Sequence, residues 1–310
     1  MPVEGSSASA DVEHASAGPD LEIVIVSFTG SRDLLRTALR SLHDHRYTGG
    51  NQLVHVVDNA SADGTAEMVR TEFPDVQLAT MDWNAGFCVA NNLVLGRATA
   101  PYVLVLNPDT EAYEGSLDHM IRFMEENPAA GMAGCRLEKR DGTLDHASKR
   151  AFPTPFSALS HFTGAGNRLG GRFAGYQAPE LGEYERGQVD AINGAWMLVR
   201  MSAVQDVGLL DVNYWLYMED LDWCYRFHQK GYEVWYDGSV SFLHVKGGTS
   251  KEKGHRRLRQ NMAFHRGMGR FYRKFYAGRN PLLDTAVYLG IGAKLSVAVI
   301  RSSIARQSLA

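Results

Sequence analysis

Cysteine is scarce in this 310-residue sequence, which has three, at Cys88, Cys135 and Cys224. They are far apart and form no C-x-x-C pair, so a zinc ribbon and a thioredoxin-type redox motif are excluded. Scattered free thiols are typical of a reducing cytosol, where they serve as small core residues. The cysteine content therefore favours a cytoplasmic protein.

The glycine signatures of two large nucleotide-binding classes are also absent. The first predicted strand is followed by only Gly30, whereas a dinucleotide site requires G-x-G-x-x-G at that place. The phosphate loop G-x-x-x-x-G-K-[ST] does not occur in the sequence. These absences argue against dehydrogenases and P-loop NTPases. A nucleotidyltransferase is expected to have a glycine-rich, basic phosphate loop after the first strand, and the short turn 30–33 gives little support to that class.

The first 20 residues lack both the apolar core and the basic start of a secretory signal peptide. Because they are rich in serine, alanine, glycine and acid, we expect a disordered tail over residues 1–20. The longest apolar stretch, Pro281–Ile300, is interrupted by Asp284 and Lys294. These two charges argue against a membrane span and favour a helix that lies on a membrane surface.

Charge is unevenly distributed, although the net value is only -3. Residues 251–310 hold 13 of the 32 lysines and arginines and two of the 35 acids, which gives this segment +11 and the rest of the chain -14. We therefore expect a globular domain over residues 21–250, with a boundary near residue 110, followed by a basic, amphipathic helical region over residues 251–310.

Residues 21–110 alternate between apolar strands and helices. The predicted strands are 21–28, 53–57, 76–80 and 102–106, and the predicted helices are 32–45, 66–73 and 85–97. Because the strands are continuously apolar, this order predicts an α/β fold with a mostly parallel sheet and helices on both faces.

Polar residues follow each of these four strands. In a parallel sheet such residues gather beyond the carboxyl ends, where ligands bind. In any single loop they are equally explained by capping and turns, with Asp63 as a helix cap and Gly64 as a turn residue. Four such loops together favour a site. Its candidate residues are Ser27, Phe28, Asp58, Asn59, Asp63, Asn84, Gly86, Asn107 and Asp109.

The second half of the domain contains a cluster of acids and a lone histidine. Its predicted elements are a helix over 117–126, strands over 131–137, 189–200, 232–236 and 240–244, an irregular acceptor-binding region over 150–188, and a helix that begins within 213–230. The acids Glu219, Asp220 and Asp222 follow an aromatic run. They fit either a helix start, with Asp222 paired to Arg226, or a sugar site with a general base.

His244 ends the last predicted strand and precedes a glycine-rich, basic loop over 246–250. A histidine at such a place is often structural. It is also a suitable ligand for Mg²⁺ or Mn²⁺, and the loop could surround phosphate oxygens.

Seven motifs occur in one order: VIVSFTG, VVDNASADGT, NAGFCVANN, LNPDT, NGAWMLVR, YMEDLDWCYR and HVKGGTS. Over residues 21–250 the sequence resembles a family 2 inverting glycosyltransferase of the GT-A fold, a Rossmann-like α/β architecture. Within that family it looks most like the bacterial rhamnosyltransferases that use dTDP-L-rhamnose. The resemblance implies a nucleotide-sugar donor, linked to dTDP or UDP. It also implies a glycan or polyprenyl-diphosphate-linked acceptor in the synthesis of cell-wall or surface polysaccharide.

The resemblance also implies roles at matched positions. Ser27 and Phe28 would line the nucleobase pocket, Asp58 would accept from the pyrimidine N3–H, and Asp63 and Asn84 would lie near the nucleotide and its ribose. The donor sugar and acceptor would lie near Gly194, Ala195, Trp196, Glu219 and Asp220. Asp220 matches the catalytic base, and Glu219 is the alternative or supporting acid.

The family's D-x-D-like metal motif is altered here, because Asn107 stands in place of the first acid. The resemblance then implies that Asp109 supplies the carboxylate ligand for Mg²⁺ or Mn²⁺ and that His244 is the second protein ligand. The diphosphate and water would complete the shell.

Ten basic residues between 251 and 279 alternate with aromatic residues. We interpret this region, extended by 281–300, as a peripheral contact with anionic lipid at the inner face of the cell membrane. The other interpretations are a solvated helix packed on the domain and, more remotely, a nucleic-acid-binding segment. We expect no nucleic-acid partner, since nucleic-acid binding would leave the acidic residues after the predicted strands without a role. The alternative donor is a UDP-linked galactofuranosyl, glucosyl or N-acetylglucosaminyl group, and a homodimer is compatible with the sequence.

Overall fold

The computed structural model describes residues 18–154, 181–245 and 254–307, with side chains of 254–257 and 301–307 left out. The predicted tail over 1–20 therefore lies largely outside the described residues. The same holds for most of the predicted acceptor region 150–188 and for the loop 246–250.

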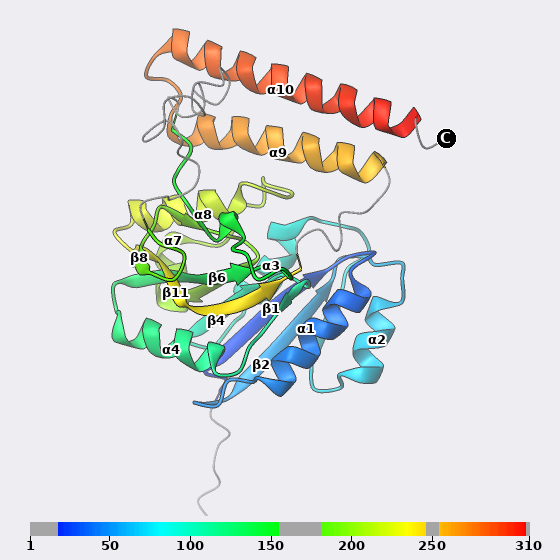
Figure 1. The fold of residues 1–310 in the computed structure, drawn as a ribbon, viewed down its shortest axis with the longest axis vertical. Coiled ribbons are helices and arrows are strands. Elements are labelled where there is room, and N and C mark those ends of the chain that lie inside the picture. The colour runs from blue at the N-terminus through cyan, green and yellow to red at the C-terminus, as the bar shows by residue number, and fades with distance from the viewer. Residues whose placement is uncertain (1–17, 155–180, 246–253, 308–310) are drawn as a thin grey trace, which may run out of the picture.

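A mixed sheet of nine strands forms the centre of the described chain (Figure 1). Its order is β3-β2-β1-β4-β10-β6-β11-β5, and β8 pairs with β11. The strands are β1 (Leu21–Ser27), β2 (Gln52–Asp58), β3 (Gln77–Thr80), β4 (Tyr102–Leu106), β5 (Thr110–Glu111), β6 (Ala130–Glu138), β8 (Arg186–Gln188), β10 (Trp196–Arg200) and β11 (Glu233–His244). Six of them run in one direction, because only β5, β8 and β10 are antiparallel to their neighbours. The predicted mostly parallel α/β fold is confirmed.

Helices cover both faces of this sheet. They are α1 (Arg32–Asp44), α2 (Thr65–Glu72), α3 (Phe87–Leu95), α4 (Ser116–Glu126), α7 (Met201–Val207) and α8 (Glu219–Gln229). Side chains alternate along β1, so Ile23 and Ile25 pack with α1 and α4, whereas Val24 and Val26 pack with α3 and α8. Both faces of β1 are therefore covered, and the strand is buried at every position.

Several elements differ from the sequence prediction. One strand, β11, replaces the two predicted over 232–236 and 240–244, and a register shift between Asp237 and Ser241 marks the interruption. The segment over 189–200 divides into β9 (Ala191–Ile192) and β10. Strand β9 pairs with β7 (Lys149–Arg150), which follows the short helix η1 (His146–Ser148) directly in the chain. By contrast, the helix expected to begin within 213–230 does begin there, at Glu219, directly after Tyr217 and Met218, whose φ values of 68° and 74° a right-handed α-helix does not adopt.

The C-terminal region forms two long helices, α9 (Gly254–Phe275) and α10 (Pro281–Gln307). They run antiparallel, and α10 lies farther from the sheet (Figure 1). Phe271 of α9 is 1% exposed and belongs to the same core as Trp223 and Phe227 of α8. The basic region is therefore a layer of the domain, joined to it by shared apolar packing.

An ion pair fixes α9 to α8. Nζ of Lys274 lies 2.6 Å from Oδ2 of Asp222 and 2.9 Å from Oδ2 of Asp211. Asp222 is fully buried, and its other oxygen accepts from Nε of Arg226 at 2.8 Å, which is the pair expected from the sequence. A carboxylate without solvent needs such cations, because burying an unpaired charge is strongly unfavourable.

The outer helix α10 is less amphipathic than expected. Val287 and Ile291 pack on Tyr272 of α9, and Asp284 accepts from the Tyr272 hydroxyl at 2.6 Å. The opposite side carries exposed apolar residues as well. With a mean hydropathy of 1.5 and 11% of it buried, Pro281–Ile300 meets the length and composition of a membrane-crossing helix, despite the two charges that argued against one.

Replacing Lys274 tests the attachment of α9. Lys274→Met removes a cation from the buried Asp222, so we expect the free energy of unfolding to fall by about 1–3 kcal/mol. Lys230→Met is the matched control, because its pair with Asp206 is about half exposed on both sides. It should cost less than about 1 kcal/mol. Equal small losses in urea denaturation would show that the ion pair does not hold α9 in place.

Candidate functional site

A cavity of about 530 Å³ lies beyond the carboxyl ends of β1, β2 and β4. One wall comes from the loops after these strands, and the other from residues 215–217 and α9. The predicted residues that line it are Phe28, Asn59, Asn84, Gly86, Asn107 and Asp109. Six of the nine candidate residues that follow the strands therefore line one cavity.

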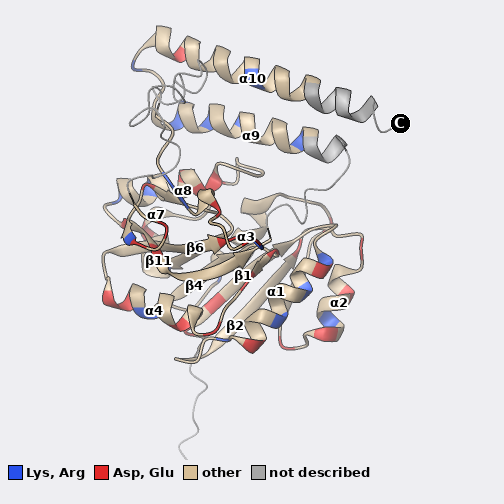
Figure 2. Cartoon of the chain, viewed as in Figure 1, with Lys and Arg blue, Asp and Glu red and all other residues tan. Residues whose placement is uncertain are grey.

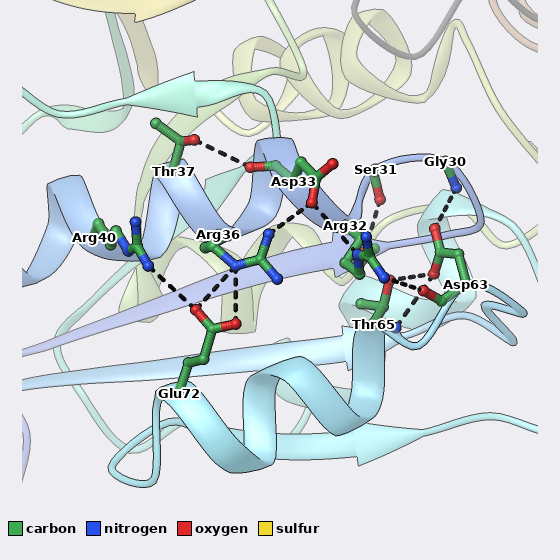
Figure 3. A network of polar contacts seen from close by, with 11 residues as sticks. Gly30, Ser31, Arg32, Asp33, Arg36, Thr37, Arg40, Asp63, Thr65 and Glu72 are labelled. Carbon is green, nitrogen blue, oxygen red and sulfur yellow. Dashed lines mark hydrogen bonds and ion pairs between the residues drawn. The ribbon is translucent and has the colours of Figure 1, made fainter.

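Three other candidate residues lie behind this cavity. Ser27 is fully buried, and its hydroxyl contacts that of Ser31 at 2.8 Å. Oδ1 of Asp58 accepts from the backbone N–H of Ser61 at 3.1 Å. Asp63 accepts from the N–H of Gly30 at 2.6 Å and from the Thr65 hydroxyl at 2.5 Å, and these hydrogen bonds help to lower its pKa although burial opposes them (Figure 3). In these positions the side chains join and shape the loops that form the cavity.

Asn59 organises the back of the cavity. Its Oδ1 accepts from the N–H of Ala85 at 2.9 Å, and its Nδ2 donates to the carbonyl of Gly86 at 3.2 Å. Gly86 has φ of 90°, and a Cβ there would lie 2.4 Å from the carbonyl oxygen of Trp215. That oxygen accepts from the N–H of Phe87 at 2.8 Å. The two walls of the cavity are therefore in direct backbone contact at a position that requires glycine.

Asp109 and His244 meet at the far end of the cavity. Antiparallel pairing of Thr110 with His244 brings β5 beside β11, and Oδ1 of Asp109 lies 3.5 Å from Nε2 of His244. On the other ring nitrogen, Nδ1 lies 2.9 Å from Oδ2 of Asp145. Burial alone would lower the pKa of His244, but its contacts with Asp109 and Asp145 raise it to about 9. The pair of carboxylates thus favours a positive charge at this point.

Asp220 lies at the start of α8 and is 8% exposed. Its Oδ2 accepts from Nη2 of Arg150 at 2.5 Å and from the N–H of Gly194 at 3.0 Å. These two donors fix the orientation of the Asp220 side chain.

Glu219 is buried without such partners. Its Oε2 has no hydrogen-bond partner within the described ranges. Burial, together with the nearby charge of Asp220, raises the pKa of Glu219 to about 8. At neutral pH this side chain carries a proton, so it is the weaker candidate for a base.

None of the five predicted neighbours of the sugar lines the cavity, and two of them lie in the core. Trp196 is 1% exposed and packs against Phe242 at 5.1 Å between ring centroids, because it is an inward residue of β10. Ala195 is also buried, and its carbonyl accepts from the N–H of Asn107 at 2.9 Å. Both residues support the site from the core, whereas Gly194 contacts Asp220 directly.

Sequence reasoning missed Asp145 and Arg150 and gave Arg259 only a membrane role. Asp145 orients His244, and Arg150 holds Asp220. Both lie next to the short β7 strand, far in sequence from their partners and outside any recognised motif. The guanidinium of Arg259 lies 4.0 Å from the centroid of the Trp215 ring, on the wall of the cavity. Among the described residues, no group of three or more metal-ligating side chains is present.

Comparison with known proteins agrees with this geometry. The sequence profile of the family described as Glycosyl transferase family 2 matches residues 23–201. The chain belongs to glycosyl transferase family 2. It is therefore a glycosyltransferase, as the motifs implied.

Relatives of this glycosyltransferase include the N-acetylglucosaminyl-diphospho-decaprenol L-rhamnosyltransferase of Mycobacterium tuberculosis, which is 30% identical over 64% of this chain and 67% of its own length. The rhamnosyltransferase WbbL of Escherichia coli is 28% identical over 46% of this chain and 52% of its own. Among solved structures, the mannosyltransferase PcManGT of Pyrobaculum calidifontis, in complex with GDP-Man and Mn²⁺, matches with a TM-score of 0.56 and 16% identity. That match covers 94% of this chain and 74% of PcManGT. The structural match confirms the predicted GT-A fold.

Proposed function

We propose that this glycosyltransferase transfers L-rhamnose from dTDP-L-rhamnose to a polyprenyl-diphosphate-linked sugar or a related glycan in cell-wall or surface polysaccharide synthesis. The observation that carries the proposal is the 30% identity to a rhamnosyltransferase whose acceptor is a decaprenyl-diphosphate sugar. A UDP-linked galactofuranosyl, glucosyl or N-acetylglucosaminyl donor is the alternative within the same family. Thymine and uracil present the same N3–H, so Asp58 would accept from either.

The nucleotide would occupy the 530 Å³ cavity. Phe28 and the Asn59–Asn84 pair line its inner wall, and Trp215 and Arg259 line the outer wall. An aromatic ring, amide groups and a cation suit a base, a ribose and a diphosphate respectively. This distribution supports binding of the nucleotide across the ends of β1, β2 and β4.

Asp109 and His244 would hold a divalent cation, Mg²⁺ or Mn²⁺. Their facing atoms are 3.5 Å apart, near the separation of about 3 Å expected for adjacent ligands of an octahedral ion. Asp145 fixes His244 from the opposite ring nitrogen, an arrangement typical of metal-binding histidines. When bound, the cation would neutralise charge on the departing diphosphate. With Asn107 in place of an acid, diphosphate oxygens and water would supply the other ligands.

Asp220 would act as the general base. It would take the proton from the acceptor hydroxyl, whose oxygen then attacks the anomeric carbon opposite to the diphosphate and inverts the configuration. No covalent intermediate forms, so one protein carboxylate at the reacting carbon is sufficient. Arg150 and the backbone N–H of Gly194 would hold that carboxylate in one position throughout the reaction.

Substitutions of the two adjacent acids separate their roles. Asp220→Asn keeps the shape of the side chain but removes the base, so we expect donor binding to persist and kcat to fall by about 10²–10⁴-fold. Glu219→Gln replaces a protonated acid by a neutral amide of similar shape, and its kcat should stay close to that of the wild type. An equal loss in both variants, or near-normal turnover of Asp220→Asn, would contradict the assignment.

The proposed reaction is tested with a panel of nucleotide sugars. Release of nucleoside diphosphate is measured with and without a polyprenyl-diphosphate-linked N-acetylglucosamine acceptor, in Mg²⁺, in Mn²⁺ and after chelation. We expect dTDP-L-rhamnose to give the highest acceptor-dependent rate and chelation to abolish it. Preference for a UDP-sugar would select the alternative donor, and unchanged turnover in chelator would contradict the metal site.

The proposed location is the inner face of the cell membrane. Described side chains on the exposed side of α10 between residues 281 and 300 carry no charge, and they include Leu282, Leu289 and Ile300, which are 84%, 69% and 57% exposed. Basic residues lie on the neighbouring α9 (Figure 2). An apolar face beside a cationic one fits the interface of an anionic bilayer.

Vesicle flotation tests this contact. Leu289→Glu places a charge on the outer side of α10, so binding to vesicles that contain anionic phospholipid should fall at least about tenfold, because burying leucine contributes about 2 kcal/mol. Leu93→Glu is the matched control, since Leu93 is exposed on α3 within the domain body. Equal flotation of Leu289→Glu and wild type would contradict the membrane role of α10.

A further inference from the structure

A second pocket lies on the other side of the 213–217 loop. Its volume is about 430 Å³, and it is bounded by residues 213–215 and one side of α9. Three arginines line it, Arg259, Arg266 and Arg270. Their spacing of seven and four residues places them on one face of the helix. The pocket therefore concentrates three positive charges at one place.

These charges have no counterions in the described part of the chain. No carboxylate there lies within ion-pair distance of any of the three guanidinium groups, although Lys274, one turn farther along α9, contacts two aspartates. Aromatic rings accompany the arginines, with Arg259 4.0 Å from the Trp215 ring centroid and Arg270 5.8 Å from that of Tyr214. Rings orient guanidinium groups without neutralising them. The pocket is thus suited to an anionic ligand.

The floor between the arginines is apolar. Leu258, Met262 and Ala263 lie on the same side of α9. Gly267 allows α9 to approach the segment just before α8 closely, since a Cβ there would lie 3.0 Å from both the carbonyl oxygen of Tyr217 and Cγ of Met218. A ligand that combines an anionic group with a hydrocarbon chain matches both parts of this surface.

The pocket adjoins the proposed donor cavity. Trp215 and Arg259 line both hollows, and the 213–217 loop between them is followed in the chain by Met218 and then by Glu219 and Asp220 at the start of α8. Occupants of the two hollows would therefore share the side chains of Trp215 and Arg259.

We propose that the arginine pocket binds the diphosphate of the lipid-linked acceptor, with its first isoprene carbons on the apolar floor. This inference rests on the proposed acceptor class and adds the residues that recognise it. Guanidinium groups bind phosphate oxygens in pairs of parallel hydrogen bonds, so two or three arginines suffice for one diphosphate.

The test uses Arg266→Ala and Arg270→Ala, because neither residue lines the donor cavity. Initial rates are measured in neutral detergent micelles, with a polyprenyl-diphosphate-linked sugar and with the same sugar as a neutral alkyl glycoside. We expect each variant to raise KM for the diphosphate acceptor at least about tenfold, as for the loss of a charge-assisted hydrogen bond. KM for the donor and for the neutral acceptor should be unchanged. Arg279→Ala, which removes an exposed arginine outside the pocket, is the matched control.

Calorimetry with farnesyl diphosphate gives a second measurement that needs no turnover. Binding by the full-length wild type that weakens about tenfold in both variants supports the site, even if no sugar is transferred and the proposed reaction itself fails. An unchanged KM for the diphosphate acceptor, an equal loss with the neutral acceptor, or no binding of farnesyl diphosphate overturns the inference. If the variants lose only affinity for anionic vesicles, the pocket binds lipid headgroups and the inference is likewise wrong.

Discussion

Three carboxyl groups in the first turn of α8, those of Glu219, Asp220 and Asp222, are buried, and the way each is compensated determines how the surrounding parts meet. Asp220 is paired with Arg150 of β7 and with the backbone after β9, whereas Asp222 is paired with Arg226 and with Lys274 of α9. Oε2 of Glu219 has no hydrogen-bond partner among the described residues, and burial raises the pKa of this side chain. The three acids thus differ in how their burial is compensated. One helical turn thereby joins the sheet, a small two-stranded ribbon and the C-terminal layer.

The periodic features of the fold follow from local sequence. The apolar strands of 21–110 and the polar residues after them correctly located the cavity, because both signals lie within a few residues of each other. The position of Trp196 was misjudged and Arg150 was missed, because their contacts depend on residues that are distant in the sequence. Whether Trp196 points into the core depends on its register against β4 and β6, and the partner of Arg150 is 70 residues away. The start of α8 lies within the expected range, whereas the positive φ values of the two non-glycine residues before it have no signature in the residue pattern.

The split between an acidic body and a basic C-terminus also has a structural explanation. Part of the positive charge compensates buried acid, because Lys274 contacts Asp222. Another part, Arg259, Arg266 and Arg270, lines a pocket beside the 530 Å³ cavity. The outermost helix, by contrast, is nearly uncharged on its exposed side (Figure 2). Within this layer, the charges of α9 therefore have specific places in the structure, whereas the exposed side of α10 has almost none.

The close contact of Gly267 with Tyr217 and the pairing of Lys274 with Asp222 restrict how such a protein can be recombined. The C-terminal helices could be exchanged between glycosyltransferases as modules if only a linker connected them to the rest of the domain. Here a foreign helix would have to present a residue without a side chain at one position and a cation two turns later, in register. A chimera that lacked either would leave a steric clash or an uncompensated charge beside the first turn of α8. The body and its C-terminal helices have to be inherited, or engineered, as one unit.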